Sequence, residues 1–201
     1  FSADDFVTAY KPLGHLLYPP TALVQIENTH NRAGGIVVPQ KTVDAVCAAA
    51  RARSVATFLD GARIWNASVA SHLTPAELAA PFDVVAVAFS KGLGAPAGSA
   101  LAGSRGFIAQ ATRHRRMFGG AMRQVGILAA AAQHALDHHM GRLGDDHVNA
   151  RRIADRLAAC KGVDLDLTTV QTNIVVFKLT PGAPDAAHFV AKAKEKGVLA
   201  I

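Results

Sequence analysis

The sequence predicts an α/β protein whose sheet is mostly parallel. Apolar, β-prone runs alternate with segments whose apolar residues recur at helical spacing, which is typical of α/β folds. One apolar run ends at Asp60, and the next, residues 84–89, is followed by Ser90 and Lys91. Each polar group therefore lies at the carboxyl end of a predicted buried strand. In open α/β sheets, that edge is where ligands bind.

The first elements predict a βαβ unit. A short strand at 24–26 precedes a crossover helix, and the next strand ends at Asp60. The crossover helix follows Pro39 and is predicted by apolar residues at helical spacing, namely Val43, Val46, Cys47 and Ala50. The two strands are therefore expected to be parallel neighbours. Further strands are predicted at 84–89, 98–102 and 174–179, and further helices at 74–80, 105–118, 121–136, 145–159 and from 185.

A break in the pattern at 141–144, which is rich in glycine, predicts a domain boundary. We expect residues 1–140 to be part of a large domain and residues 141–201 to be part of a smaller C-terminal α/β domain. In the helix at 145–159, the side chains of Val148, Ile153 and Leu157 are expected to point inward.

Composition predicts a soluble globular protein. Half of the 201 residues are apolar, and no apolar run reaches the roughly 20 residues that span a bilayer. Cys47 and Cys160 both fall on apolar sides of helical patterns, so we expect two buried thiols, a reducing compartment and a cytoplasmic protein. His134 and His138 lie one helical turn apart, but no further ligand completes a metal site, so we expect none.

The formal charge of +6 raises the possibility of a nucleic-acid partner. Basic residues are not interleaved with aromatic ones, however, so we expect no nucleic acid to bind. An anionic cofactor and an anionic substrate account for part of the excess more economically.

Asp60 and Lys91 together suit the chemistry of pyridoxal phosphate. A lysine amine holds this cofactor as a Schiff base, and a carboxylate keeps its ring nitrogen protonated so that the ring accepts electrons. The same two residues also fit a buried ion pair, or a capping aspartate and a surface lysine.

Five segments in order resemble the signatures of the threonine aldolase family: Glu27–Asn31, Gly34–Gly35, Leu59–Arg63, Ser90–Pro96 and Gly119–Gln124. The resemblance implies a pyridoxal-phosphate enzyme of the aspartate-aminotransferase-like fold type I, in the β-eliminating lyase group. It implies cleavage of β-hydroxy-α-amino acids, such as L-threonine or L-allo-threonine, to glycine and an aldehyde. It also implies a homodimer or homotetramer.

The same resemblance implies roles for individual residues. Lys91 and Asp60 are the expected catalytic residues, and both bind the cofactor. Arg63 is expected to grip the substrate carboxylate, although a surface or interface arginine is the alternative. Ser90 has a short hydroxyl and is expected to contact a phosphate or another cofactor oxygen, or else to be a small residue tolerated in a tight strand end.

Arg116 and Arg123 are expected to approach the cofactor phosphate or the neighbouring subunit's site. A solvated basic helix end is the alternative for both. His30, within the Glu27–Asn31 segment, is expected to stabilise its loop by hydrogen bonds rather than to act as a base.

The sequence departs from the family pattern at Leu17 and Pro20, where similar enzymes carry a histidine near the substrate hydroxyl and an arginine. Loss of that histidine is expected to weaken cleavage unless His15, a ring-stacking group outside this chain, or an ordered water replaces it. We also expect the chain to be a fragment lacking both ends, with the phosphate-binding loop and the ring-stacking residue before Phe1. The alternatives are a β-eliminating lyase or a transaminase on the same scaffold, or a non-catalytic homologue that acts as an interaction module.

Overall fold

The computed structural model describes residues 1–14 and 16–200, so His15, one candidate for the missing base, lies outside the described residues. The strands are β1 (Leu23–Glu27), β2 (Ala56–Gly61), β3 (Val84–Ala88), β4 (Ser99–Gly103), β5 (Val163–Asp164) and β6 (Lys178–Leu179). The α-helices are α1 (Ala3–Ala9), α2 (Gln40–Arg51), α3 (Ile64–Ser71), α4 (Pro75–Ala79), α5 (Arg105–Met117), α6 (Gly126–His139), α7 (Leu143–Ala158) and α8 (Ala186–Glu195). Short 3₁₀ helices are η1 (Asn31–Ala33), η2 (Met140–Arg142) and η3 (Leu167–Thr169).

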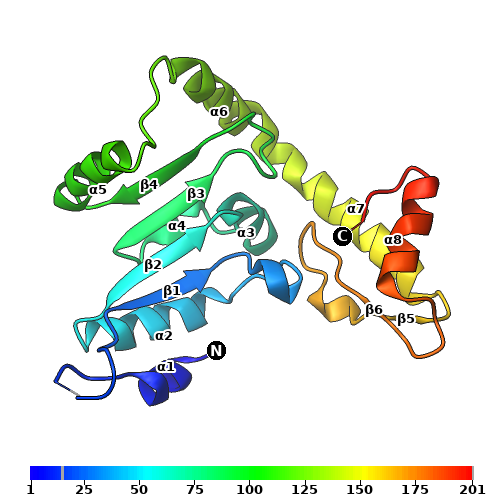
Figure 1. The fold of residues 1–201 in the computed structure, drawn as a ribbon, viewed down its shortest axis with the longest axis horizontal. Helices are drawn as coiled ribbons and strands as arrows, with labels where there is room; N and C mark the ends of the chain where they lie inside the picture. Colours follow the sequence, from blue (N-terminus) through cyan, green and yellow to red (C-terminus); the bar gives the residue numbers. More distant parts are fainter. Residues whose placement is uncertain (15, 201) are drawn as a thin grey trace.

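The main sheet has the strand order β1-β2-β3-β4 (Figure 1). β1, β2 and β3 are parallel, and β4 is antiparallel to β3. The expected α/β class, mostly parallel sheet and βαβ unit are therefore confirmed. The register pairs Glu27 with Asp60 and Asp60 with Ala86, so the ends of the three parallel strands lie at one edge.

Helix α2 covers β1 as its periodicity predicts. Its four apolar positions at helical spacing are all buried, and they pack with Val24 and Ile26 of β1 and Phe6 of α1. The same burial raises the pKa of the Cys47 thiol to about 11, because the charged thiolate is poorly solvated there. Thr74 forms a capping box with Glu77 at the start of α4, next to Pro75. The apolar spacing of α2 and the capping residues of α4 therefore predicted both helices correctly.

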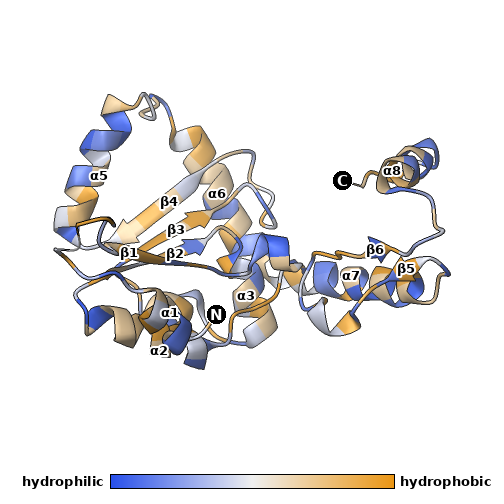
Figure 2. Ribbon diagram, turned by 60° about the horizontal axis from the view of Figure 1, so that its bottom comes forward, coloured by the Kyte–Doolittle hydropathy of each residue, from blue (hydrophilic) through white to orange (hydrophobic). Residues whose placement is uncertain are grey.

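The two faces of the sheet differ in cover. Figure 2 shows α1, α2 and α3 on one side and α5 on the other. On the covered face, Leu59 and Val85 pack with Ile64, Ala67 and Leu78. Every residue of β4 is exposed, and none of α5 is buried. Only Val85 of β3 is buried and the other four residues are half-buried, because the second face is largely open within the described residues. The strand is therefore less buried than expected.

Several expectations for the C-terminal half were also wrong. The helix expected from residue 121 begins at Gly126, because Gly119 and Gln124 adopt positive φ in the turn before it. Val148 and Ile153 are 58% and 55% exposed. The buried residues of α7 are Leu143, Ala150 and Ala154, and small alanines let α7 approach α3 closely.

Two further expectations were wrong, namely the strand at 174–179 and the burial of Cys160. The strand expected at 174–179 is reduced to Lys178–Leu179, because β5 offers only two residues to pair with it. Cys160 is exposed, because it follows the end of α7.

Helix α8 begins after its expected cap, Asp185. The predicted domain boundary near Gly141 falls in η2, and the division into residues 1–140 and 141–201 stays a prediction.

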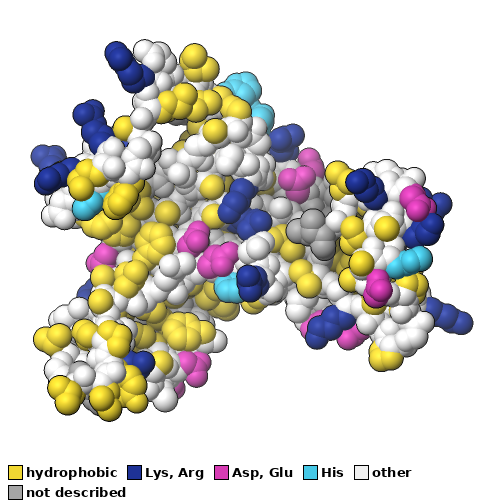
Figure 3. Space-filling view, viewed as in Figure 1, with side chains coloured by type: hydrophobic (Ala, Val, Ile, Leu, Met, Phe, Trp, Pro, Cys, Tyr) yellow, Lys and Arg dark blue, Asp and Glu magenta, His cyan; other side chains and the backbone are white. Residues whose placement is uncertain are grey.

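The helices and the surface charges bear on the choice of binding partners. None of the helices that the structure describes combines the length and apolar composition that crossing a bilayer requires. On the face shown in Figure 3, basic side chains form several separate groups, including one over α5 and others around the C-terminal helices.

Candidate functional site

Asp60 and Lys91 follow the carboxyl ends of neighbouring parallel strands. Asp60 is the second-last residue of β2, and Lys91 lies three residues beyond the end of β3. Asp60 is half-buried and Lys91 is exposed. Within the described residues the two side chains form no ion pair, so the sequence alternative of a buried Asp–Lys pair is not what the structure shows. Both charged groups are available to a ligand at this edge.

The strand itself directs Asp60 toward the open face of the sheet. Side chains alternate along a strand, and Thr57 and Leu59 are buried on the face that α3 and α4 cover. Asp60 therefore faces the other way. Its Oδ1 accepts a hydrogen bond from the Ala62 backbone N–H at 3.1 Å.

Gly61 is required directly after Asp60. A Cβ at this position would lie 2.9 Å from the backbone oxygen of Ala86 on β3. Any larger residue would push β2 and β3 apart at the edge where Asp60 lies.

Lys91 begins a tight turn. The Gly94 N–H donates to the Lys91 carbonyl at 2.8 Å, and Gly94 has a φ of +72° that favours glycine. The Ala95 N–H donates to the Phe89 carbonyl at 3.0 Å and closes the loop behind the turn. The lysine is thus presented from a bend and not from the strand ladder. Ser90 is exposed just before it.

Arg63 lies close in sequence to Asp60, at the position that caps the start of α3. It is half-buried, and among the described residues its guanidinium has no hydrogen-bond or ion-pair partner. An unpaired guanidinium at a strand edge can bind a carboxylate with two parallel hydrogen bonds. Its expected role as the substrate carboxylate ligand is compatible with this position and stays a prediction.

Arg116 and Arg123 are not brought to this edge. Arg116 lies near the end of α5, Arg123 lies in the turn before α6, and both are exposed. Figure 1 shows the connection between α5 and α6 away from the ends of β2 and β3. Within this chain, the structure therefore assembles Asp60, Arg63 and Lys91 but not the two arginines.

The segment after β1 forms a wall beside Asp60. The Asn28 N–H donates to the Asp60 carbonyl at 3.0 Å, and Asn28 Oδ1 accepts from the Val38 N–H at 3.2 Å. His30 Nδ1 accepts from the Ala33 N–H at 3.2 Å, so its ring caps η1, as the sequence suggested. The periodicity of the sequence did not predict that Asn28, just after β1, is buried and hydrogen-bonded to β2.

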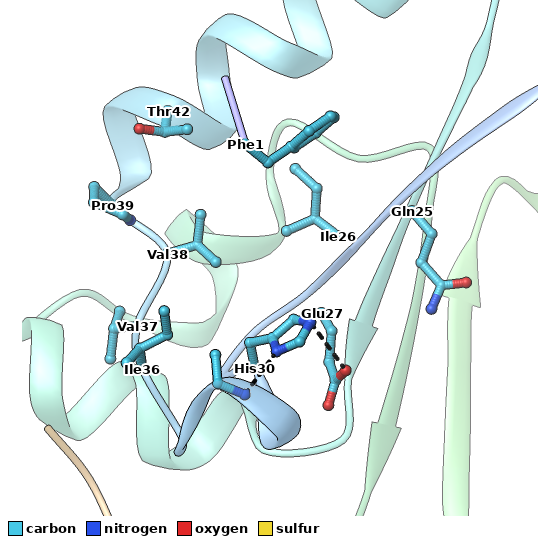
Figure 4. Close-up of a pocket in the computed structure, with 11 residues that line it drawn as sticks. Phe1, Gln25, Ile26, Glu27, His30, Ile36, Val37, Val38, Pro39 and Thr42 are labelled. Carbon is cyan, nitrogen blue, oxygen red and sulfur yellow. Dashed lines mark hydrogen bonds and ion pairs between the residues drawn. The ribbon is translucent and has the colours of Figure 1, made fainter. Parts of the chain in front are cut away.

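A pocket of about 530 Å³ lies at the free edge of β1, lined among others by Ile26, Glu27, His30, Val38 and Thr42. Figure 4 shows the His30 ring turned toward Glu27, whose Oε2 lies 3.9 Å from His30 Nε2. The pocket does not include Asp60, Arg63 or Lys91.

Leu17 and Pro20 lie in the segment between α1 and β1, at the amino-terminal end of β1 (Figure 1). Asp60 and Lys91 belong to the opposite edge, and a strand the length of β1 spans roughly 15 Å. Leu17 is 77% exposed. The structure therefore does not bring Leu17 beside the proposed site, whatever base similar enzymes carry there.

The His134 and His138 rings have centroids 4.4 Å apart on α6. Over residues 1–14 and 16–200, no group of three or more metal-ligating side chains gathers around them or elsewhere.

The residues present fit pyridoxal phosphate in part. An unpaired amine and a carboxylate stand on adjacent strand ends, Asp60 faces the uncovered side of the sheet, and glycines after both residues keep the backbone clear. These groups would hold the ring and the covalent link.

The chain resembles several known proteins along most of its length. It is 38% identical over 191 residues to low-specificity L-threonine aldolase 1 of Arabidopsis thaliana, covering 94% of this chain and 53% of that protein. It is 40% identical over 179 residues to the low specificity L-threonine aldolase of Escherichia coli O157:H7, covering 89% and 51%. The chain thus spans about half the length of the curated relatives it matches.

A solved Listeria monocytogenes structure, of a candidate L-allo-threonine aldolase, superposes with a TM-score of 0.82 at 25% identity, covering all of this chain and 54% of that one. The fold is therefore that of the fold-type-I enzymes expected from the sequence. The family model described as beta-eliminating lyase matches residues 1–180. The chain belongs to the beta-eliminating lyase family.

Proposed function

We propose that the protein containing this chain is a pyridoxal-phosphate-dependent lyase that cleaves β-hydroxy-α-amino acids, such as L-threonine or L-allo-threonine, to glycine and an aldehyde. Threonine aldolases and beta-eliminating lyases depend on this cofactor. The observation that carries the proposal is the position of Asp60 and Lys91, which form no ion pair with each other, after adjacent strand ends of a chain that resembles threonine aldolases over most of its length.

The residues of this chain would divide the work as follows. The Lys91 amine would hold the cofactor covalently and would exchange a proton at the substrate Cα. The Asp60 carboxylate would keep the ring nitrogen protonated. Arg63 would bind the substrate carboxylate and so fix the orientation of the bonds at Cα. When bound, pyridoxal phosphate accepts the electron pair left on Cα as the Cα–Cβ bond breaks.

Two finer statements belong to the same proposal. We infer a homodimer or homotetramer, because exposed apolar side chains gather around the connection between α5 and α6: Met117, Phe118, Met122, Val125 and Ile127. We infer the cytoplasm, because both cysteines are free thiols. Light scattering of the full-length protein tests the first inference, and a monodisperse, fully active monomer would contradict it.

Product analysis separates this reaction from its rivals. Full-length protein incubated with L-threonine and with L-allo-threonine is expected to yield glycine and acetaldehyde in equal amounts. Ammonia with a keto acid would indicate β-elimination, and amino-group exchange with a keto acid would indicate a transaminase. Absence of any cofactor absorption in the intact protein would favour a non-catalytic homologue.

Lys91→Ala tests the covalent link directly. Borohydride treatment of the full-length protein followed by peptide mapping is expected to label Lys91, and the alanine variant is expected to lose both the label and all measurable cleavage. Lys41→Ala, an exposed lysine on α2, is the matched control and should keep both. A label on Lys41 or Lys11 instead would rule out the assignment of Lys91.

A further inference from the structure

The turn that carries Lys91 is anchored from a distant part of the chain. Leu93, two residues after the lysine, is 0% exposed and packs with Ala132, Ala135 and Leu143. These residues come from α6 and from the start of α7. The backbone after Lys91 is therefore seated on the joint between these two helices.

His139 completes this anchor with a hydrogen bond. It is the last residue of α6, it is half-buried, and its Nδ1 lies 2.6 Å from the Leu93 carbonyl oxygen. A carbonyl oxygen can only accept, so Nδ1 must carry the hydrogen and donate it. A Cβ at Gly94 would lie 3.4 Å from Arg142 Nη2 and 3.9 Å from His139 Nδ1. Both side chains thus lie directly over the turn.

The turn needs such an anchor, because its own sequence supplies little rigidity. Gly92 and Gly94 flank Leu93, and glycine loses more conformational freedom on folding than any other residue. Lys91 lies beyond the strand, so no ladder hydrogen bond holds it. Within the turn, the Gly94 N–H donates a short hydrogen bond to the Lys91 carbonyl, but this bond spans only the one bend and does not link it to another element.

We propose that His139 is a positioning residue for Lys91. In this role it acts through the turn. It fixes the Leu93 peptide, and through it the direction in which the Lys91 side chain leaves the turn. The inference deepens the proposed function and rests on it, because it takes Lys91 as the residue that holds the cofactor.

The same joint also reaches the loop after Asp60. On α7, His147 Nε2 lies 3.1 Å from Asn66 Nδ2, and Asn66 is a buried residue of α3, the helix that follows Asp60 and Arg63. A Cβ at Gly92 would lie 3.0 Å from Leu143 Cδ2 and 3.1 Å from Asn66 Oδ1. The α6–α7 joint, α3 and the Lys91 turn therefore meet at Gly92.

The test compares two substitutions of nearly equal size in the full-length protein. His139→Asn keeps an N–H donor near the position of Nδ1, whereas His139→Leu does not. Hydrogen exchange of the Gly94 and Ala95 amides in cofactor-free protein reports on the turn itself. Steady-state kinetics with L-threonine separate kcat from KM. His138→Leu, an exposed neighbour on α6, is the matched control.

We expect His139→Leu to speed exchange of the Gly94 amide by about tenfold, the size of one net hydrogen bond, and to lower kcat by at least as much with KM little changed. We expect His139→Asn to restore most of both, and His138→Leu to change neither. If His139→Leu does not fold, His139→Phe keeps the ring without the donor and carries the same expectations.

The inference would be overturned by unchanged exchange in the turn, by an equal loss in His138→Leu, or by loosening of all amides together with no rescue by asparagine. Faster exchange at Gly94 with unchanged kcat would also overturn it, since the contact would then be structural only. The exchange readout needs no cofactor, so it stands apart from the proposed function, whose failure would appear as full activity of Lys91→Ala.

Discussion

Asp60 and Lys91 lie on neighbouring strands, yet different parts of the chain hold them in place. The Asp60 carboxylate is held from within its own segment, by the Ala62 N–H and by the alternation of β2. The Lys91 turn is held from α6 and α7, through Leu93, His139 and Leu143. The acid is therefore positioned by local structure, and the amine by packing between elements distant in sequence. Substitutions near each residue should separate these two kinds of support.

The largest effect is expected from Asp60→Asn, which tests the local side of the comparison. The amide oxygen can still accept from the Ala62 N–H, so the thermal unfolding midpoint should stay nearly unchanged. The rate should fall by about 10³-fold or more, because an amide cannot hold the cofactor ring nitrogen protonated. The activation free energy then rises by several kcal/mol.

Asp44→Asn on α2, an exposed position, is the matched control for that experiment and should change neither property. A loss of only a few-fold in kcat for Asp60→Asn, or a large fall in its unfolding midpoint, would show that Asp60 is chiefly structural.

Leu93→Ala tests the support that α6 and α7 give to the Lys91 turn. Removing a fully buried leucine leaves a cavity between the turn and the α6–α7 joint, and the free energy of unfolding should fall by about 2–5 kcal/mol. Denaturant titration measures it. Leu101→Ala on β4 is the control, because that side chain is 40% exposed and should cost much less. Equal losses at the two positions would show that the joint is not a distinct support.

A smaller, pH-dependent effect on the free energy of unfolding is expected at His147, whose hydrogen bond to Asn66 links α7 to α3. Burial lowers the pKa of His147 below its usual value of 6.5, because the charged ring is poorly solvated there. The unfolded chain therefore binds the proton more readily. The stability this group contributes is complete above pH 6.5 and is lost as the pH falls through the lowered folded pKa.

Denaturant titrations of wild type and His147→Gln, at about pH 7.5 and about pH 5, check the sign. Glutamine can still accept from Asn66 but does not titrate, so the loss of stability toward acid should be smaller in this variant. The exposed His134→Gln removes one histidine elsewhere and should keep the wild-type loss. An unchanged loss in His147→Gln would contradict the assignment.

The smallest effect is expected from Leu17→His. Sequence reasoning alone expects this change to accelerate cleavage by restoring a base, since a missing general base typically costs about 10²–10⁴-fold. The structure places the segment at the opposite end of β1 from Asp60, so we expect kcat to change by less than about threefold. A gain of about 10²-fold with L-threonine would show that this segment reaches the site in the full-length protein.

Much of the site was readable from the sequence because its signals are local. An apolar run that stops at an acid or at Ser-Lys predicts a strand end, and consecutive parallel strands bring their ends to one edge. Gly61 and Gly94 likewise mark places where the backbone leaves no room for a side chain or takes a positive φ. Arg116 and Arg123 carried no such signal, since their roles came from resemblance alone. In this chain they lie away from the edge.

The sequence by itself determined the α/β class, the βαβ unit, the caps of α4 and α8, and the placing of Asp60 and Lys91 at neighbouring strand ends. Each of these depends on residues a few positions apart, whose spacing carries the period of a helix or a strand. Only the tertiary structure decided that α7 buries alanines instead of Val148 and Ile153, and that His139 lies over the Lys91 turn. Those choices depend on which surfaces meet after the chain has folded, and a contact between residues 93 and 139 leaves no periodic trace in the sequence.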